Sequence, residues 1–461
     1  MLLATLLACQ KTEGTLGLSW DITPGVAVTG KFIDIELDAP GTAVLTCTSK
    51  DDSRDIHVVR LDTSRELHST GVHGLLSSST YDCVIDAEAE GGLWARGEFR
   101  TSTGRLPVGL EEGSVYGDPE AMTGVWTLTN PFDDGKATND QRMVILDPEG
   151  EVRWYYGLDD ELGSVDCSIE DGRIVWGGGY EGDSAPRIMT VGGVVLYKGE
   201  EPTTGGVYHH DVGLTESGYM AGLITKQGDS YIAFGVEVRD PENDGELLYM
   251  WESDVAVAKG ELPEGRGDLY HANALEIEEV DGDPRYAWVN VRNLNRYIRI
   301  DLVEQTIDRK LLAGSGLNDD DAWNLSHDTK RVGETLLMYD NGYRKPGESS
   351  RVVEYEADLE AGTYELVWEW TEDNWREPAW GGADWLENGN VLVAIGHCEG
   401  SSCDEAHPDG RSAVIEVDRE TDEIVWAYRW EDEKVGLYRA ERADGCDLFS
   451  NAQFCPQLLD P

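Results

Sequence analysis

Short apolar segments alternate with polar turns along most of the chain, and beyond about residue 112 they form a repeat. One apolar segment recurs six times, at residues 124–128, 173–176, 219–223, 286–289, 335–338 and 390–394. A second apolar segment usually follows, at residues 143–147, 297–301, 351–355 and 413–417. A third, which contains tryptophan, often comes next, at residues 151–154, 248–251, 366–370 and 424–428.

Strands at this spacing, in units of about 50 residues without a helical period of 3.6, are typical of a β-propeller and not of a βαβ fold. Six units predict six blades. The units are longer than WD repeats and lack the Gly-His and Trp-Asp signature. The recurring tryptophans are expected to pack between the blades.

The segment before the repeat has a different pattern. Residues 15–103 contain short alternating strands such as 43–47, 56–59 and 81–85. Residues 75–83 resemble the corner between strands E and F of fibronectin type III domains, and residues 97–101 resemble their last strand. The sequence therefore predicts an all-β protein, in which a small fibronectin III/Ig-like β-sandwich precedes a six-bladed β-propeller.

The expected boundaries are residues 1–14 for a lipoprotein signal and linker, 15–103 for the sandwich, 104–437 for the propeller and 438–461 for a C-terminal tail. In the first segment, an apolar run ends at Cys9 as in a bacterial lipobox, although no basic residue precedes the run. Lipidation of Cys9 would tether the protein to a bacterial membrane. No apolar run is long enough for a transmembrane helix.

The cysteines indicate an oxidising compartment, the periplasm or the cell surface. The expected disulfide pairs are Cys47 with Cys83, Cys398 with Cys403, and Cys446 with Cys455. Cys167 remains as a buried thiol. Ordinary free thiols are the alternative, because spacing alone does not establish connectivity.

Charge excludes two classes of partner. The 461 residues include 37 Lys and Arg against 90 Asp and Glu, which gives a net charge of −53. Binding to nucleic acid or to anionic lipid needs clustered basic residues, and none are visible. Membrane contact is therefore expected only through the N-terminal lipid. The sandwich is expected to act as a spacer or as the contact in a possible homodimer.

Histidine occupies one register in three consecutive repeats, at His210, His271 and His327. The chain has only nine histidines. Segments that enter the inner strands of a propeller face its central channel, so residues in one register converge. Arg292, near the end of the strand that follows His271, adds a cation. Imidazoles and a guanidinium inside an acidic protein predict a site for a small oxyanion, and water-filled polar lining is the alternative.

These motifs resemble the bacterial arylsulfate sulfotransferases. The resemblance rests on His-Ala-Asn at 271–273, Arg292, Ser-His-Asp at 326–328, the Asp-Asn-Gly at 340–342, and Leu-Glu-Asn-Gly-Asn at 386–390. It covers residues 115–430 and is strongest over 205–397. It implies a six-bladed propeller behind an N-terminal β-sandwich in the periplasm.

The resemblance also implies an activity, the transfer of a sulfuryl group from a phenolic sulfate ester to another phenol without a nucleotide sulfate donor. By motif position, His327 matches the histidine that becomes transiently sulfated, and His210, His271 and Arg292 match its partners. Asn273, Tyr208 and Tyr270 are expected to bind the substrate. The partners would be a small aryl sulfate donor and a phenolic acceptor, with no cofactor.

Two other functions remain open from the residues. Three imidazoles could hold zinc or copper, although Arg292 beside a dication would be repulsive, so no metal is expected. Alternatively, the propeller is a non-catalytic binding module on the cell surface. Its acidic loops 240–244 and 318–321 lack an EF-hand pattern and are expected to be solvated surface.

Overall fold

The computed structural model describes most of the chain. The described residues are 11–107, 109–110, 113–122, 126–133, 142–158, 166–179, 184–227, 232–314, 321–342, 349–372, 375–377, 379–396, 412–431, 435–444, 446 and 448–459. They are almost entirely β-structure, with one α-helix, α1 (Ser253–Ala258), and four short 3₁₀ turns. The 3₁₀ turns are η1 (Glu90–Gly92), η2 (Pro241–Asn243), η3 (Arg292–Leu294) and η4 (Pro456–Leu459).

The N-terminal part is a single six-stranded antiparallel sheet. Its strands are β1 (Lys11–Gly14), β2 (Leu18–Pro24), β3 (Lys31–Ser49), β4 (Ile56–Val72), β5 (Thr80–Ala89) and β6 (Leu93–Ser102). The order is β1-β6-β5-β3-β2, and β4 pairs with the other side of β3. Buried and exposed residues alternate along β3 and β5, as in strands with one face on a core.

This sheet differs from the two packed sheets that the sequence predicts. The first half of β3 pairs with β2, and its second half, beyond Gly41, pairs with β5. The register of β3 against β4 shifts on both sides of Gly41. Such irregularities bend a strand, so one long strand serves both layers and the sheet curls around its apolar core.

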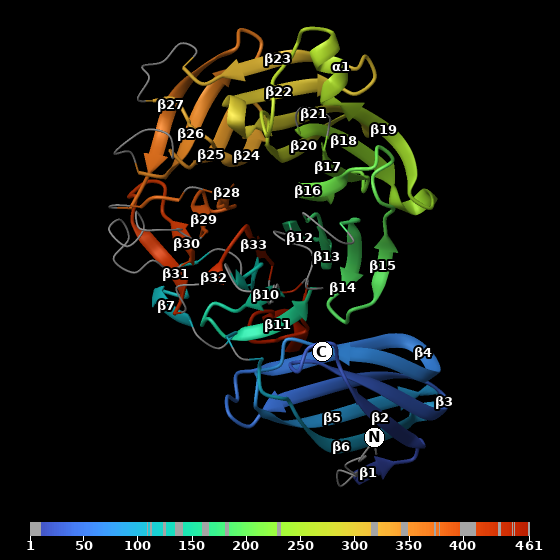
Figure 1. The fold of residues 1–461 in the computed structure, drawn as a ribbon. Helices are drawn as coiled ribbons and strands as arrows, with labels where there is room; N and C mark the ends of the chain where they lie inside the picture. Colours follow the sequence, from blue (N-terminus) through green and yellow to red (C-terminus); the bar gives the residue numbers. More distant parts are fainter. Residues whose placement is uncertain are drawn as a thin grey trace.

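The rest of the chain forms six antiparallel sheets arranged in a ring among the described residues (Figure 1). From the outside inward, the first sheet contains β11 (Val152–Gly157), β10 (Arg142–Leu146), β8 (Trp126–Thr129) and β33 (Ala440–Ala443). From the inside outward, the second contains β12 (Asp166–Glu170), β13 (Arg173–Gly177), β14 (Arg187–Thr190) and β15 (Val195–Lys198).

The other sheets follow the inside-outward order of the second. The third contains β16 (Val207–Leu214), β17 (Met220–Gln227), β18 (Ile232–Asp240) and β19 (Glu246–Glu252). The fourth contains β20 (Ala272–Val280), β21 (Asp283–Val291), β22 (Arg296–Asp301) and β23 (Thr306–Leu312). The fifth contains β24 (His327–Val332), β25 (Thr335–Asp340), β26 (Arg351–Asp358) and β27 (Thr363–Trp370). The sixth contains β28 (Gly382–Trp385), β29 (Val391–Ile395), β30 (Ala413–Val417), β31 (Ile424–Trp430) and β7 (Gly113–Gly117).

These sheets are consistent with propeller blades. The innermost strands contact one another in succession, β12 with β16, β16 with β20, β20 with β24, β24 with β28, and β28 with β33, while β33 also contacts β12. The contacts therefore run completely around the ring. Separate apolar clusters fill the spaces between sheets, for example around Trp251 between the third and fourth and around Leu392 between the sixth and first.

The ring is closed by strands from both sides of the repeat. β33 pairs with β8 to complete the first sheet, and β7 pairs with β31 at the outer edge of the sixth. A two-stranded pair, β9 (Phe132–Asp133) with β32 (Val435–Gly436), also joins these regions. β33 lies in the segment that the sequence assigns to the C-terminal tail, because a four-residue strand separated from its sheet by about 300 residues carries no periodic signal.

Two of the expected disulfides are present, Cys47–Cys83 between β3 and β5 and Cys446–Cys455 in the C-terminal segment. Cys167 is free and buried, as predicted. Cys9, Cys398 and Cys403 lie outside the described residues. No helix among the described residues is long and apolar enough to cross a membrane.

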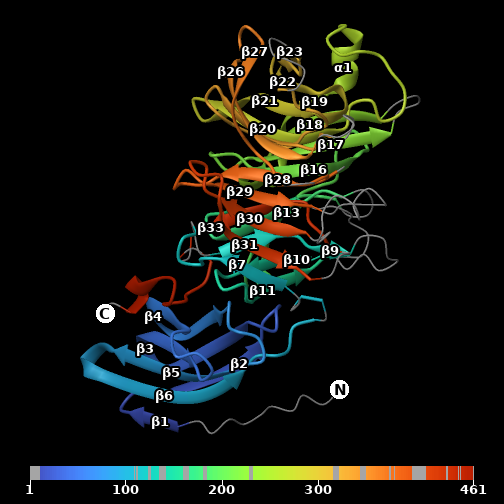
Figure 2. The ribbon, with the colours of Figure 1, turned by 90° about the vertical axis from the view of Figure 1, so that its left-hand side faces the viewer.

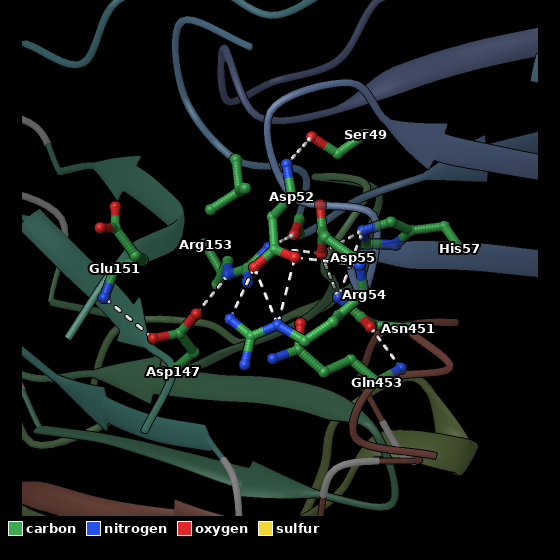
Figure 3. Close-up of polar contacts among 12 residues, drawn as sticks. Ser49, Asp52, Arg54, Asp55, His57, Asp147, Glu151, Arg153, Asn451 and Gln453 are labelled. Atoms are coloured by element: carbon green, nitrogen blue, oxygen red, sulfur yellow. Dashed lines mark hydrogen bonds and ion pairs between the residues drawn. The ribbon is translucent and has the colours of Figure 1, made fainter. Parts of the chain in front are cut away.

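The N-terminal sheet lies against one side of the ring (Figure 2), and a buried ionic cluster joins the two (Figure 3). Arg153 of β11 donates from Nε to Asp147 Oδ2 at 2.6 Å and from one terminal nitrogen to Asp55 Oδ1 at 2.8 Å. Asn451 donates to the same Asp55 oxygen at 2.7 Å, and the Tyr81 hydroxyl donates to the other. One guanidinium therefore compensates two carboxylates that come from different parts of the fold.

Replacing Arg153 by methionine should lower the free energy of unfolding by about 3–5 kcal/mol, because two buried carboxylates lose their cation. Arg96→Met is the matched control, since the Arg96–Asp86 pair lies on the exposed face of the N-terminal sheet and should contribute less than about 1 kcal/mol. Urea unfolding of both variants measures the difference. Equal losses would show that the cluster does not stabilise the junction.

Candidate functional site

The site lies at the innermost strands of the third, fourth and fifth sheets, where each strand has a β-bulge. The register breaks between Tyr208 and Val212 in β16, between Ala272 and Ala274 in β20, and between His327 and Thr329 in β24. His210 and His271 have positive φ angles of 69° and 48°. Bulges and left-handed residues redirect side chains and are common beside functional sites.

The three histidines lie together beside these irregularities. The Nε2 atoms of His210 and His271 lie 3.1 Å apart, and their ring centroids are 4.8 Å apart. The centroids of His210 and His327 are 6.5 Å apart. His210 and His327 are each 1% exposed. The three residues that share a register in the sequence therefore form one cluster, which is named the histidine cluster below.

The orientation of His327 is determined by Asn341. His327 Nδ1 lies 2.6 Å from Asn341 Oδ1. The Asn341 side-chain nitrogen donates to the carbonyls of Glu377 at 3.0 Å and Trp380 at 3.1 Å, so its oxygen must be the atom that faces His327. An amide oxygen only accepts. The proton of a neutral His327 is therefore on Nδ1, and its lone pair is on Nε2.

Burial keeps His210 and His327 neutral. Desolvation lowers the pKa of His327 well below its usual range, and the positive charge of Arg292 lowers it further. Desolvation also lowers the pKa of His210, with contributions from His209 and His271. The pKa of His209, which adjoins His210, falls to about 3 because of burial and the charge of His271. Neutral imidazole is the nucleophilic form.

Arg292 begins η3, immediately after β21. Its backbone N–H donates to the carbonyl of His271 at 3.3 Å, and its guanidinium donates to Asn293 Oδ1 at 2.9 Å. Its charge acts on both His327 and Asp268. The structure therefore places Arg292 beside the histidine cluster.

A second cation, Arg439, was missed by the sequence analysis. Arg439 is buried and donates to the backbone carbonyls of Gly381 at 3.0 Å and Asn273 at 3.1 Å. Its charge also lowers the pKa values of His210 and His327. Arg439 directly precedes β33, so it takes the same position in the first sheet that the histidines take in theirs. Recognising β33 as an inner strand would have identified it.

Acidic side chains connect the inner strands next to the histidine cluster. Asp166, Asp211 and Asp328 each accept a hydrogen bond from a backbone N–H of the next sheet, at Val212 (3.1 Å), Leu275 (2.8 Å) and Ala383 (3.0 Å). Arg439 lies 3.4 Å from Asp328 and 3.7 Å from Asp166. Burial and the nearby Asp211 raise the pKa of Asp166 to about 7.

The expected substrate-binding residues are already engaged within the fold. Asn273 is buried, donates to the carbonyl of Ser326 at 3.0 Å and accepts from Asn290 at 2.7 Å. The Tyr208 hydroxyl donates to Glu237 at 2.8 Å. The Tyr270 hydroxyl donates to the carbonyl of Pro263 at 2.8 Å, and its ring packs in the apolar core. Their substrate-binding role stays a prediction.

The sequence analysis also missed three polar partners, Asp268, Asn341 and Tyr438. Asp268 bonds to Nδ1 of His271, and the Tyr438 hydroxyl lies 2.8 Å from Nδ1 of His210. Each histidine in the cluster therefore has a different partner at Nδ1. Among the described residues, no group of three or more His, Cys, Asp or Glu side chains has an arrangement that could hold a metal ion.

Comparisons with known proteins bear on this site. No curated protein matches the chain. Among solved structures, Hsv2 from Kluyveromyces lactis aligns at 10% identity with a TM-score of 0.33, covering 79% of this chain and 96% of that chain. The structure titled Hsv2 complete loop 6CD from the same organism aligns at 9% identity with a TM-score of 0.31, covering 87% and 99%. Scores this low contribute nothing to the argument.

A family model is more informative. Residues 304–439 match the model described as Arylsulfotransferase (ASST). The match contains His327, Asn341 and Arg439. It begins at residue 304, so it does not include His210, His271 or Arg292. It covers only part of the chain, and the family implies a sulfotransferase that acts on aryl sulfates. Over residues 304–439, this chain is therefore similar to the arylsulfotransferase (ASST) family.

Proposed function

We propose that this protein is an arylsulfate sulfotransferase that moves a sulfuryl group from a phenolic sulfate ester to a phenol through a sulfated His327. The observation that carries the proposal is the histidine cluster, in which a buried, neutral His327 has its Nε2 lone pair available and lies beside Arg292. The family match over residues 304–439 supports it independently.

In the first half-reaction, His327 Nε2 attacks sulfur and the bond from sulfur to the aryl oxygen breaks. Charge develops on the sulfuryl oxygens and on the departing phenolate, and fixed cations stabilise such charge most effectively in a site that excludes water. Arg292 is the expected partner of the sulfuryl oxygens. Arg439 adds positive potential without leaving its own carbonyl partners.

The departing phenolate needs a proton when its conjugate acid has a pKa of about 10, the value for tyrosine. His210 or His271 can donate that proton and later remove one from the acceptor phenol. The second half-reaction reverses the first, because the acceptor oxygen attacks sulfur and the bond to His327 breaks. No nucleotide donor is required.

The surroundings of the cluster suit a reactive intermediate. His210 and His327 are buried at the centre of the ring of sheets, so bulk water has little access to a sulfated His327. The proposal takes the ring as a six-bladed propeller and the N-terminal sheet as a fibronectin III-like module. The Cys47–Cys83 and Cys446–Cys455 disulfides support a periplasmic or surface location, where Cys9 would carry the lipid.

His327→Asn should abolish transfer. We expect the parent to release phenol from a chromogenic aryl sulfate faster when a phenol acceptor is present, with ping-pong kinetics, and to gain the mass of one sulfuryl group on a peptide containing His327. His73→Asn, in the N-terminal sheet, is the matched control and should keep both properties. Transfer by His327→Asn at the parent rate would refute the assignment, and the absence of turnover on any aryl sulfate would favour a binding protein.

The pH profile of the first half-reaction tests the electrostatics. Burial and Arg292 lower the pKa of His327, so the neutral form persists as the pH falls through 6.5, the value for a free imidazole. At about pH 5.5, roughly nine-tenths of free imidazole is protonated. His327 should still be neutral at this pH and should still react in a single-turnover sulfation experiment. The measurement uses a donor whose phenolate needs no protonation. We expect its sulfation rate not to decrease with an apparent pKa of about 6.5. A rate that falls about fivefold between pH 6.5 and 5.5, as the neutral fraction of free imidazole does, would contradict this.

A further inference from the structure

Four side chains form a continuous hydrogen-bonded series through the histidine cluster. The Tyr438 hydroxyl lies 2.8 Å from His210 Nδ1. His210 Nε2 lies 3.1 Å from His271 Nε2, and His271 Nδ1 bonds to Asp268. Tyr438 is completely buried, while the side chain of Asp268 is 38% exposed. The series therefore leads from the buried centre of the ring to its surface.

The carboxylate determines the direction of every bond in the series. Hydrogen bonds to His271 hold the pKa of Asp268 below its usual range although burial opposes this, so Asp268 only accepts. His271 Nδ1 must then carry a proton, and Nε2 of a neutral His271 must accept. His210 Nε2 must donate to it, so Nδ1 of a neutral His210 accepts from the Tyr438 hydroxyl.

We propose that Asp268 and Tyr438 are positioning residues that give the two histidines different roles. Asp268 makes His271 the group that takes up and returns a proton at Nε2, because its charge stabilises the imidazolium. Tyr438 holds His210 as a fixed donor at Nε2. This inference rests on the proposed sulfotransferase function and resolves which of the two histidines moves the proton.

Asp268 is suited to this role because the other groups near His271 are cationic or imidazole. Arg292, His209, His210 and His327 all act electrostatically on His271 or on Asp268. Each of them disfavours a second positive charge. Asp268 is held in place by Asn293, whose side-chain nitrogen donates to the Asp268 carbonyl at 2.7 Å.

The protons balance over one cycle. When the donor binds, His271 takes up a proton from solvent at Nε2. While His327 Nε2 forms its bond to sulfur and the aryl oxygen leaves, that proton passes to the oxygen and His271 becomes neutral. In the second half-reaction, the acceptor hydroxyl gives its proton to His271 Nε2 as its oxygen binds sulfur and the bond to His327 breaks. That proton returns to solvent, so His271 is neutral again and the cycle consumes no net proton.

Tyr438 matters while His271 is charged. A protonated His271 donates at both nitrogens, so it would bond to His210 Nε2 if His210 were free to change tautomer. That change would require the Tyr438 hydroxyl to turn from donor to acceptor at His210 Nδ1, so Tyr438 favours the tautomer that is present. The His271 proton is then directed to the substrate oxygen and not to its neighbour.

Asp268→Asn tests the first half of the proposal, because it removes the charge with little change in shape. With a phenyl sulfate whose leaving group has a pKa near 10, sulfation of His327 should slow by about 10- to 100-fold. With an electron-poor aryl sulfate, which needs no proton, the loss should be below about 3-fold. Asp281→Asn, in the turn between β20 and β21, is the matched control and should change neither rate.

The possible outcomes separate this inference from the proposed function. Equal losses on both donors, or no loss on either, would overturn the role of Asp268 while leaving the sulfotransferase assignment intact. If the parent turns over neither donor, the proposed function fails. The hydrogen-bond directions are then tested by NMR, which needs no substrate.

Nitrogen NMR of protein labelled with ¹⁵N-histidine reads the tautomers directly. In the parent, His210 should be protonated at Nε2 and His271 at Nδ1. Tyr438→Phe should leave His210 as a mixture of tautomers, whereas Tyr116→Phe, on the exposed edge strand β7, should leave the spectrum unchanged. A parent His210 protonated at Nδ1, or a Tyr438→Phe spectrum identical to that of the parent, would overturn the role of Tyr438.

Discussion

The pairing of β33 with β8 is the contact on which the rest of the structure depends. It joins residues 440–443 to residues 126–129 and completes both the first sheet and the ring of inner strands. The two residues before β33 are Tyr438 and Arg439, and they reach the histidine cluster only because this strand lies at the centre. Closure of the ring and assembly of the site are therefore one structural event.

The site also shows how a strongly acidic protein can gather two cations beside a group of histidines. The net charge of −53 is an average over the chain, and at distances of a few ångströms the local arrangement dominates because exposed charges are screened beyond roughly 10 Å. Inside the ring, carboxylates such as Asp211 and Asp328 accept backbone hydrogen bonds and pair with Arg439 or lie near it. The charge of Arg292 acts on His327 and on Asp268.

Much of the ring was predictable from the sequence because the same pattern of apolar strands recurs in the same order in successive sheets. His210, His271 and His327 were found by register, since equivalent positions in a repeat occupy equivalent positions in space. Asp268 and Tyr438 were not found, because their roles come from contacts between distant segments. Arg439 was missed because β33 was not recognised as an inner strand, and Asn341 was noted only as part of a motif and not as the partner of His327. The N-terminal sandwich differs in detail because the bend at Gly41 of β3 allows one sheet to wrap around its own core. The pKa directions required coordinates, since they arise from burial and neighbouring charge.

The position of β33 in the chain has a consequence for biosynthesis. About 300 residues separate β33 from its partner β8, and pairing over such a separation has a large loop-closure entropy and is slow. The sheets between them can form as their strands emerge, yet the histidine cluster lacks Tyr438 and Arg439 until residues 438–443 have been synthesised and have reached the centre of the ring. A chain that stops before residue 438 would therefore retain the strands of most blades but could not complete this cluster, so the last inner strand acts as a checkpoint for full-length synthesis.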